Sequence, residues 1–285
     1  MKIYAVFYLP VLAAEKEALW QKNGLEVEWV STKGGGAMMR AMAAGALNIG
    51  LTGAVTAIKA AAAGVPTVIV ANLYPKEPFY IWVRSDSRIK KPKDLSGTKI
   101  GVAKYGGMEH VYMQIITKAL GLEGKIKVVS VGGLRAVVAG LRSKAIDGAV
   151  QPLAILVKLK ASGQARELLN TADYLPSDWV DMIVAARKDF VEGKPDTVGK
   201  MVKTVFQGVN YTLKNRQWAI SQMKIMNGYS DQAASLMFDS LRFSRDGQLS
   251  KQGLRNVRDI MIKFGVMHRY VGREPDQRRP GHPQR

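Results

Sequence analysis

Short apolar runs alternate with helical patterns along the first third of the chain. Turn residues separate the runs, and in most cases an Ala- or Met-rich stretch with helical spacing follows. Such alternation is typical of α/β proteins with parallel-type sheets. The strands predicted in this way are residues 2–8, 25–30, 46–51 and 67–71. We therefore expect the chain to begin as an α/β domain.

The pattern changes further along the chain. Residues 98–163 repeat the alternation of apolar runs and helical stretches, whereas residues 188–264 have helical periodicity and no clear strands. One face of this helical part is apolar, and it carries Met201, Val205, Val209 and Leu213. Residues 272–285 are rich in Gly, Pro, Arg and Gln and have little apolar surface. We expect them to form a disordered basic tail.

The two α/β stretches also match each other in sequence. Similar residues recur 97 positions later and, after a two-residue insertion, 99 positions later. The matched pairs include Tyr8 with Tyr105, Gly36 with Gly133, and Thr52 with Gln151. Because strand–helix alternation does not require matching tyrosines, we expect two similar lobes rather than a chance likeness. The predicted division is residues 1–81 plus 188–271 for the first lobe and 82–187 for the second.

Composition limits the chemistry that is available. The 285 residues contain no cysteine, which excludes disulfides, thiolate metal sites and thiol nucleophiles. The three histidines have no neighbour at ligand spacing, so we expect neither a metal nor a cofactor. The formal net charge is +19, but Lys and Arg are spread along the chain without interleaved aromatic residues. We therefore expect no nucleic-acid partner; the charge would steer small anions or serve only solubility.

The loops that follow the predicted strands are the candidate ligand site. In a parallel α/β sheet, ligands bind beyond the carboxyl ends of the strands, where helix N-termini present free N–H groups. Glycine in these loops lets a ligand approach the backbone closely. The candidates are Tyr8, Pro10, Gly35, Gly36, Thr52, Gly53, Tyr105, Gly106, Gly107, Met108, Gly133 and Gln151. For any one of these glycines a tight turn is the favoured explanation, but six such loops at matching places in two lobes favour a ligand site.

Two further side chains have alternative interpretations. Trp179 is a candidate for stacking on a planar ligand, with burial in the core as its alternative role. His110 begins a predicted helix and is a candidate base. A solvated or capping role is favoured for it, because no acid or nucleophile lies at a recognisable spacing. We therefore expect no catalytic residue.

Four segments resemble one family of solute-binding proteins. They are NGLEVEW at 23–29, GGG at 34–36, AAGALNIG at 43–50 and PKDLSGTKIGV at 92–102. In these segments the chain resembles the binding proteins of nitrate, sulfonate and taurine importers and the related thiamine-pyrimidine binders. The resemblance implies a type II periplasmic-binding-protein fold, with two lobes around a cleft joined by crossing strands near residues 81–86 and 183–188. It adds Ala37 to the candidate ligand contacts.

The resemblance also implies a function. Members deliver a solute to a membrane permease that is powered by an ATPase, in an ABC-type importer. We expect a monomeric periplasmic protein, with its export segment already removed, that closes on a small organic ligand by a hinge motion. The identity of the solute stays open among anionic, sulfonate and aromatic or pyrimidine-like molecules. The alternative is a cytoplasmic lyase or decarboxylase, because enzymes of menaquinone synthesis and phthalate-type decarboxylases share the fold.

Overall fold

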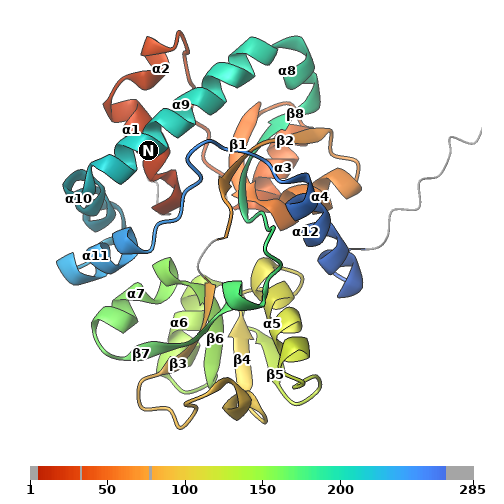
Figure 1. The fold of residues 1–285 in the computed structure, drawn as a ribbon, viewed down its shortest axis with the longest axis vertical. Coiled ribbons are helices and arrows are strands. Elements are labelled where there is room, and N and C mark those ends of the chain that lie inside the picture. Colours follow the sequence, from red (N-terminus) through yellow and green to blue (C-terminus); the bar gives the residue numbers. More distant parts are fainter. Residues whose placement is uncertain (1–5, 33, 77–78, 268–285) are drawn as a thin grey trace, which may run out of the picture.

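The fold is a mixed α/β structure built around two separate sheets (Figure 1). The computed structural model describes residues 6–32, 34–76 and 79–267. The smaller sheet has three strands in the order β1 (Ile49–Gly53), β8 (Met182–Arg187) and β2 (Thr67–Tyr74), and both outer strands are antiparallel to β8. No helix in the described part of the chain is both long enough and apolar enough to cross a membrane.

The larger sheet has five strands in the order β5-β4-β6-β3-β7. Strand β4 is parallel to β5 and to β6, whereas β3 is antiparallel to β6 and to β7. The strand bounds are β3 (Phe79–Arg84), β4 (Lys99–Val102), β5 (Lys127–Ser130), β6 (Gly148–Pro152) and β7 (Ala165–Asn170).

Helices cover both sheets and form most of the C-terminal third. The helices of the first part are η1 (Val6–Tyr8), α1 (Leu9–Lys16), α2 (Leu19–Lys22), α3 (Gly35–Ala43) and α4 (Ala54–Ala62). Those of the middle part are η2 (Pro92–Leu95), α5 (Met108–Ala119), α6 (Leu134–Arg142), α7 (Leu153–Ala161) and η3 (Thr171–Tyr174). The C-terminal set is α8 (Lys188–Gly193), α9 (Pro195–Lys214), α10 (Arg216–Asn227), α11 (Asp231–Asp239) and α12 (Lys251–Lys263). This confirms the predicted change to helix after residue 188.

The internal repeat is present in the order and length of the elements. Helix α3, strand β1 and helix α4 recur as α6, β6 and α7, and all six bounds are displaced by 99 positions. The sheets agree as well, since β1-β8-β2 and β6-β3-β7 each place an antiparallel strand in the middle. The structure moves the insertion earlier than we predicted: Gly34 and Gly133 both precede the first residue of a helix, so Gly133 corresponds to Gly34 and not to Gly36.

Two predicted strands are corrected. Residues 25–32 are irregular, with Leu25 buried and Trp29 and Val30 exposed. In the second repeat the equivalent segment forms β5, which is hydrogen-bonded to β4. Residues 25–32 pair with no described strand. Alternating apolar and polar residues do not make a strand by themselves, because the backbone hydrogen bonds need a neighbouring strand. Residues 6–8 form the turn η1 leading into α1 rather than a strand; residues 2–5 lie outside the described part.

The other two predicted strands are present with shifted ends. Strand β1 begins at Ile49 because the chain first turns at Gly45, which has a φ of +76°. Strand β2 continues to Tyr74.

The chain passes between the two sheets twice. It leaves the smaller sheet after Tyr74 and enters the larger at Phe79, then leaves the larger after Asn170 and returns at Met182. We propose that these passages mark the boundaries between two lobes. Strand β8 then belongs with the first lobe, although the predicted boundary at residue 187 put it in the second. The predicted tail at 272–285 lies outside the described residues.

Candidate functional site

A cavity of about 460 Å³ lies between α3, α4 and the loop before α5. Its walls combine residues 36–65, which surround β1, with residues 106–108, which follow β4. The contact between the two parts is close, because a Cβ atom placed on Gly53 would lie 3.9 Å from the Met108 methyl carbon. We call this space the α3–α4 cavity.

Three helices begin at or beside this cavity. Helices α3, α4 and α5 follow Gly34, Gly53 and Gly107, and none of these N-caps supplies a side-chain acceptor. The first-turn N–H groups of a helix point outward and carry its positive end. Two of them are already used, since the Ala54 N–H donates to the Asp181 carbonyl at 2.6 Å and the Ala37 N–H donates to the Gly34 carbonyl at 3.1 Å. The remaining first-turn amides make this a favourable place for an anion.

Two helix faces supply the side chains of the cavity. On α3, the lining residues Gly36, Met39 and Arg40 are spaced at i, i+3 and i+4. On α4, the lining residues Thr56, Lys59 and Ala60 have the same spacing. None of the described residues that line the cavity is acidic, so Arg40 and Lys59 give it a net positive charge. The Lys59 ammonium lies 3.5 Å from the Gly106 carbonyl oxygen and so connects α4 to the loop before α5.

The N-terminus of α3 is packed tightly against β1. A Cβ atom on Gly35 would lie 2.3 Å from the Thr52 hydroxyl oxygen, whereas one on Gly36 would meet only the Arg40 guanidinium at 3.8 Å. Thr52 itself is buried. Gly35 therefore serves the packing of α3 on the sheet, while Gly36 faces the cavity.

The loop before α5 is shaped by His110. Its Nδ1 accepts a hydrogen bond from the Gly106 N–H at 3.1 Å, which requires the proton of a neutral ring to be on Nε2. Burial lowers the pKa of His110, so the imidazole stays neutral and keeps this bond. Burial also raises the pKa of the neighbouring Glu109. His110 is thus used as a hydrogen-bond acceptor within its own loop.

Five of the fourteen sequence-predicted residues line the cavity. They are Gly36, Gly53, Gly106, Gly107 and Met108. Gly35 and Thr52 lie directly behind them, and Ala37 is on the same turn of α3.

Three predicted residues are used elsewhere. Tyr8 is packed with Phe7 against the core, and burial raises the pKa of its hydroxyl. Pro10 is buried, and its carbonyl lies where a Cβ on Gly208 of α9 would sit. Tyr105 is 59% exposed and donates its hydroxyl proton to the Val128 carbonyl at 3.0 Å.

The last three predicted residues lie away from the cavity wall. Gln151 is fully buried in β6, and its amide nitrogen and oxygen have no partner among the described residues. Gly133 precedes α6 with a φ of +153°. Trp179 is 2% exposed, and its Nε1 donates to Tyr112 and Asp181, so its ring is closed to a ligand in this conformation.

The sequence interpretation missed the helix faces. The missed lining residues are Met39, Arg40, Val55, Thr56, Lys59, Ala60 and Val65. Our sequence rule selected only loops at strand ends, although the i, i+3, i+4 spacing of small and polar residues along α3 and α4 was available. Such spacing does not by itself distinguish a cavity wall from a solvated face.

Comparisons with known proteins agree with this architecture. The chain is similar to the periplasmic aliphatic sulphonate binding protein SsuA from Escherichia coli, with a TM-score of 0.83, 18% identity, and coverage of 93% of this chain and 91% of that one. SsuA from Xanthomonas axonopodis pv. citri, solved with bound MOPS, gives a TM-score of 0.76 at 17% identity, covering 93% and 92%. The desulfurization enzyme DSZB gives 0.65 at 15% identity, covering 91% and 90%.

The sequence comparisons agree with the structural ones. A candidate binding protein of Brucella abortus (strain 2308) is 24% identical over 274 residues, which covers 91% of this chain and 82% of that protein. The periplasmic-binding-protein fold predicted from the sequence is confirmed. A family model described as NMT1/THI5 like matches residues 7–219, well over half of the chain. The chain belongs to the NMT1/THI5-like family.

Proposed function

We propose that the protein is the solute-binding component of an ABC-type importer and that it holds a small organic anion in the α3–α4 cavity. Its structural relatives include sulfonate-binding proteins, which supports this choice. The fold alone does not decide between a binder and an enzyme, since a desulfurization enzyme shares it.

The charge of the cavity carries the proposal. Arg40 and Lys59 join the uncapped N-termini of three helices around one space, and no described lining residue is acidic. Backbone N–H groups together with guanidinium and ammonium donors match the oxygens of a sulfonate or carboxylate. Met39, Val55 and Met108 give the same cavity apolar walls. A ligand with an anionic head and a short apolar tail fits both features.

Binding in this position favours a closed form. The solute would contact α3 and α4 on one side and residues 106–108 on the other. Since only the closed arrangement makes both sets of contacts, the solute shifts the population toward it. Gln151 is our candidate for a further polar contact, because a buried amide without partners costs about 1–3 kcal/mol and a ligand or water would relieve it.

The ionisable groups at the cavity suit binding better than catalysis. Arg40 and Lys59 attract and orient an anion, and His110 is already used as an acceptor within its own loop. General acid–base catalysis needs a positioned group that exchanges a proton with the reacting atom. We infer from this that the protein binds its ligand without converting it. Its structural relatives include periplasmic sulfonate-binding proteins, one of them from an ABC transporter, and this supports our further proposal that it works in the periplasm with a permease and an ATPase as partners.

Isothermal titration with alkanesulfonates of increasing chain length tests the proposal. We expect binding of the sulfonates but not of matched neutral sulfones, and a 10- to 100-fold loss in Lys59→Gln and Arg40→Gln, or about 1.4 kcal/mol per tenfold. Lys118→Gln is the matched control, because it removes the same charge from an exposed position at the far end of α5. Equal binding of sulfones, or equal losses in all three variants, would contradict the proposal. Chemical conversion of the ligand would favour the enzyme alternative.

A further inference from the structure

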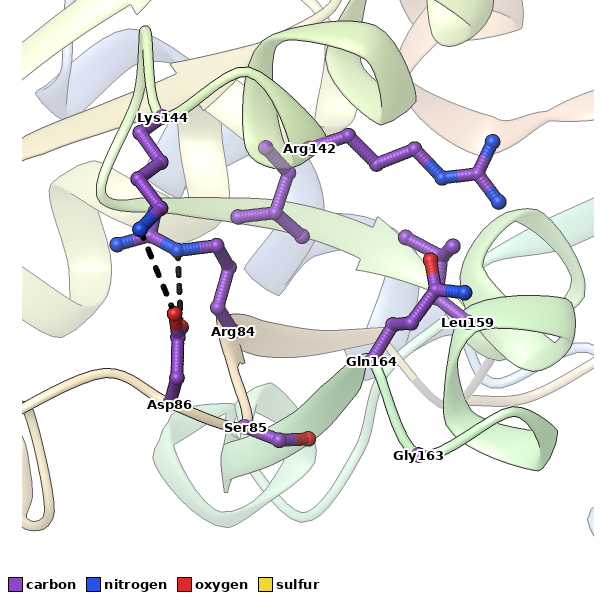
Figure 2. Close-up of a pocket in the computed structure, with 9 residues that line it drawn as sticks. Arg84, Ser85, Asp86, Arg142, Lys144, Leu159, Gly163 and Gln164 are labelled. Atoms are coloured by element: carbon purple, nitrogen blue, oxygen red, sulfur yellow. Dashed lines mark hydrogen bonds and ion pairs between the residues drawn. The ribbon is translucent and has the colours of Figure 1, made fainter.

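A second pocket, of about 340 Å³, lies at the end of the five-stranded sheet where β3 finishes. Figure 2 shows the residues that line it. It is formed where β3 ends, where α6 and α7 end, and just before β7 begins. The α3–α4 cavity, by contrast, meets this half of the protein at the start of α5, after β4. We call the second space the β3–α6 pocket.

Comparison of the two repeats shows which side chains of this pocket belong to the framework that both repeats share and which are specific to the pocket. At the end of β3, Arg84 binds Asp86 through Nε at 3.1 Å and donates to the Ile146 carbonyl at 3.3 Å. At the end of β8, Arg187 binds Asp189 in the same way and donates to the Gly45 carbonyl at 2.8 Å. Because both sheets have this Arg-x-Asp arrangement, it belongs to the shared framework and is not specific to the pocket.

Three polar side chains are additions to that framework. At the displacement of 99 positions that relates the two repeats, Arg142, Lys144 and Gln164 line the pocket at positions where the first repeat has small or apolar residues. The equivalents are Ala43, Gly45 and Val65. All three differences introduce a hydrogen-bond donor, and all three occur in one pocket.

Lys144 occupies its place at a conformational cost. Its φ is +63°, in the left-handed region, where the first repeat uses Gly45 with a φ of +76°. Residues with a Cβ rarely adopt this conformation, and they concentrate at functional sites when they do. Lysine is therefore less stable than glycine in this turn. We infer that the ammonium group of Lys144 has a role that offsets this cost.

The pocket has an excess of positive charge. Asp86 is shared between Arg84 and Lys144, whose ammonium lies 3.6 Å from the second carboxylate oxygen. Arg142 has no ion pair or hydrogen bond among the described residues. In Figure 2 its guanidinium extends over the pocket on the side of the Gln164 amide, with Leu159 behind them. Three cations and one carboxylate leave a net charge of +2.

We propose that the β3–α6 pocket binds a phosphate-type dianion. The planar guanidinium of Arg142 matches two phosphate oxygens, and the Gln164 amide adds a donor on the same side of the pocket (Figure 2). Lys144 lies on the side of Asp86 and adds positive charge there. The dianion balances the net charge of the pocket, and the apolar Leu159 accommodates a group esterified to the phosphate. The same chemistry is offered by free phosphate esters and by the headgroup of a phosphomonoester lipid. This inference does not depend on the solute of the α3–α4 cavity.

Equilibrium dialysis with labelled inorganic phosphate at low ionic strength tests the proposal. We expect Arg142→Gln and Lys144→Gly each to weaken binding at least 10-fold, and Lys118→Gln, with the same loss of charge on the other face of the sheet, to change it less than twofold. Lys144→Gly restores the glycine of the first repeat, so its thermal midpoint should be equal or higher while phosphate binding falls. The series is also measured with Arg40→Gln and Lys59→Gln combined, which removes the anion-binding charge of the α3–α4 cavity.

Vesicles distinguish the two sources of the phosphate group. Sedimentation is measured with neutral phosphatidylcholine vesicles and with the same vesicles containing phosphatidic acid. Binding of inorganic phosphate that depends on Arg142 and Lys144 supports a soluble ligand, and binding of the acidic vesicles alone with the same dependence supports a headgroup. Absence of binding in both arms overturns the proposal. So does a loss in Lys118→Gln equal to the losses in the two pocket variants.

Discussion

The two adjacent glycines at the start of α3 give a sharp test of how the candidate site is built. In Gly35→Ala the new methyl carbon would lie 2.3 Å from the Thr52 hydroxyl oxygen and 3.1 Å from the Thr56 methyl carbon. Thr52 is 4% exposed within β1, so relief requires α3 to move away from the sheet. Overpacking of this kind costs about 1–3 kcal/mol.

Gly36→Ala is the matched control. Its methyl carbon would meet only the Arg40 guanidinium at 3.8 Å, which is ordinary contact with a flexible side chain. Replacing glycine by alanine in a helix gains up to about 1 kcal/mol, and this gain offsets part of the cost at Gly35. We therefore expect Gly36→Ala to be neutral or stabilising and Gly35→Ala to lie roughly 2 kcal/mol below it.

Urea unfolding and ligand titration together measure the difference. Gly36 lines the α3–α4 cavity, so its methyl group should weaken binding of an anion in a protein of unchanged stability. Gly35→Ala should lower the stability first, and roughly 2 kcal/mol corresponds to a thermal midpoint about 4–8 °C lower in a protein near this size. Equal unfolding midpoints for the two variants would mean that α3 is not packed on β1 as the structure has it.

Three further predictions concern the framework around the site. Gly208→Ala in α9 should destabilise by about 1–3 kcal/mol, since its methyl carbon would lie 1.9 Å from a carbonyl oxygen of α1. Gly199→Ala in the same helix meets nothing within 4 Å and should stabilise by up to about 1 kcal/mol, so equal effects in chemical denaturation would contradict the packing of α1 on α9. Tyr229→Phe should lose about 0.5–1.5 kcal/mol, because the hydroxyl donates to a carbonyl at the start of α7 at 2.6 Å; an unchanged unfolding curve would show that this contact is not formed. Burial lowers the pKa of His110 in the folded protein below its ordinary 6.5. As the pH falls, His110 is therefore protonated in the unfolded chain before it is protonated in the folded protein. The stability that comes with the neutral ring and its Gly106 hydrogen bond is lost as the pH falls below about 6.5. His110→Asn, whose amide oxygen accepts without titrating, should flatten the stability profile between pH 7 and 5; parallel profiles would refute this role.

The repeat made much of the fold predictable from the sequence. Matches such as Thr52 with Gln151 indicated that one strand–helix unit occurs twice, and the bounds of β1 and β6 coincide at that displacement. The crossings predicted near residues 81–86 and 183–188 overlap β3 and β8, whereas the chain changes sheet before each of these strands, after Tyr74 and after Asn170. The sheet partners of the two strands could not be assigned from the sequence. Strand partners depend on which distant segments meet in space, and a local pattern contains no such information.

The candidate site was predictable only in its backbone. Glycines at strand ends, such as Gly53 and Gly107, mark places where a helix begins, and that rule is local. The sequence could not decide the roles of the aromatic candidates, because their size suits a core as well as a cleft. Trp179 and Tyr8 are held by packing from elements far away in sequence, and nothing adjacent to them distinguishes the two roles.

The two repeats have different side chains at equivalent positions of α4 and α7, and this difference supports the position that we propose for an anion. In the first repeat the face of α4 carries Thr56 and Lys59 beside an open cavity. In the second, the equivalent Ile155 belongs to the apolar core, and the equivalent Lys158 lies over the Tyr229 ring at 5.7 Å. Helix α11 packs against α7 there, whereas α12 packs against α4 and leaves Thr56 and Lys59 at the cavity. In our proposal an anionic head is held by the first repeat, and the second contributes chiefly the backbone of residues 106–108. If the proposal holds, closure depends on a loop with few side-chain contacts to the solute, and we expect solute selectivity to be set by the walls of α3 and α4.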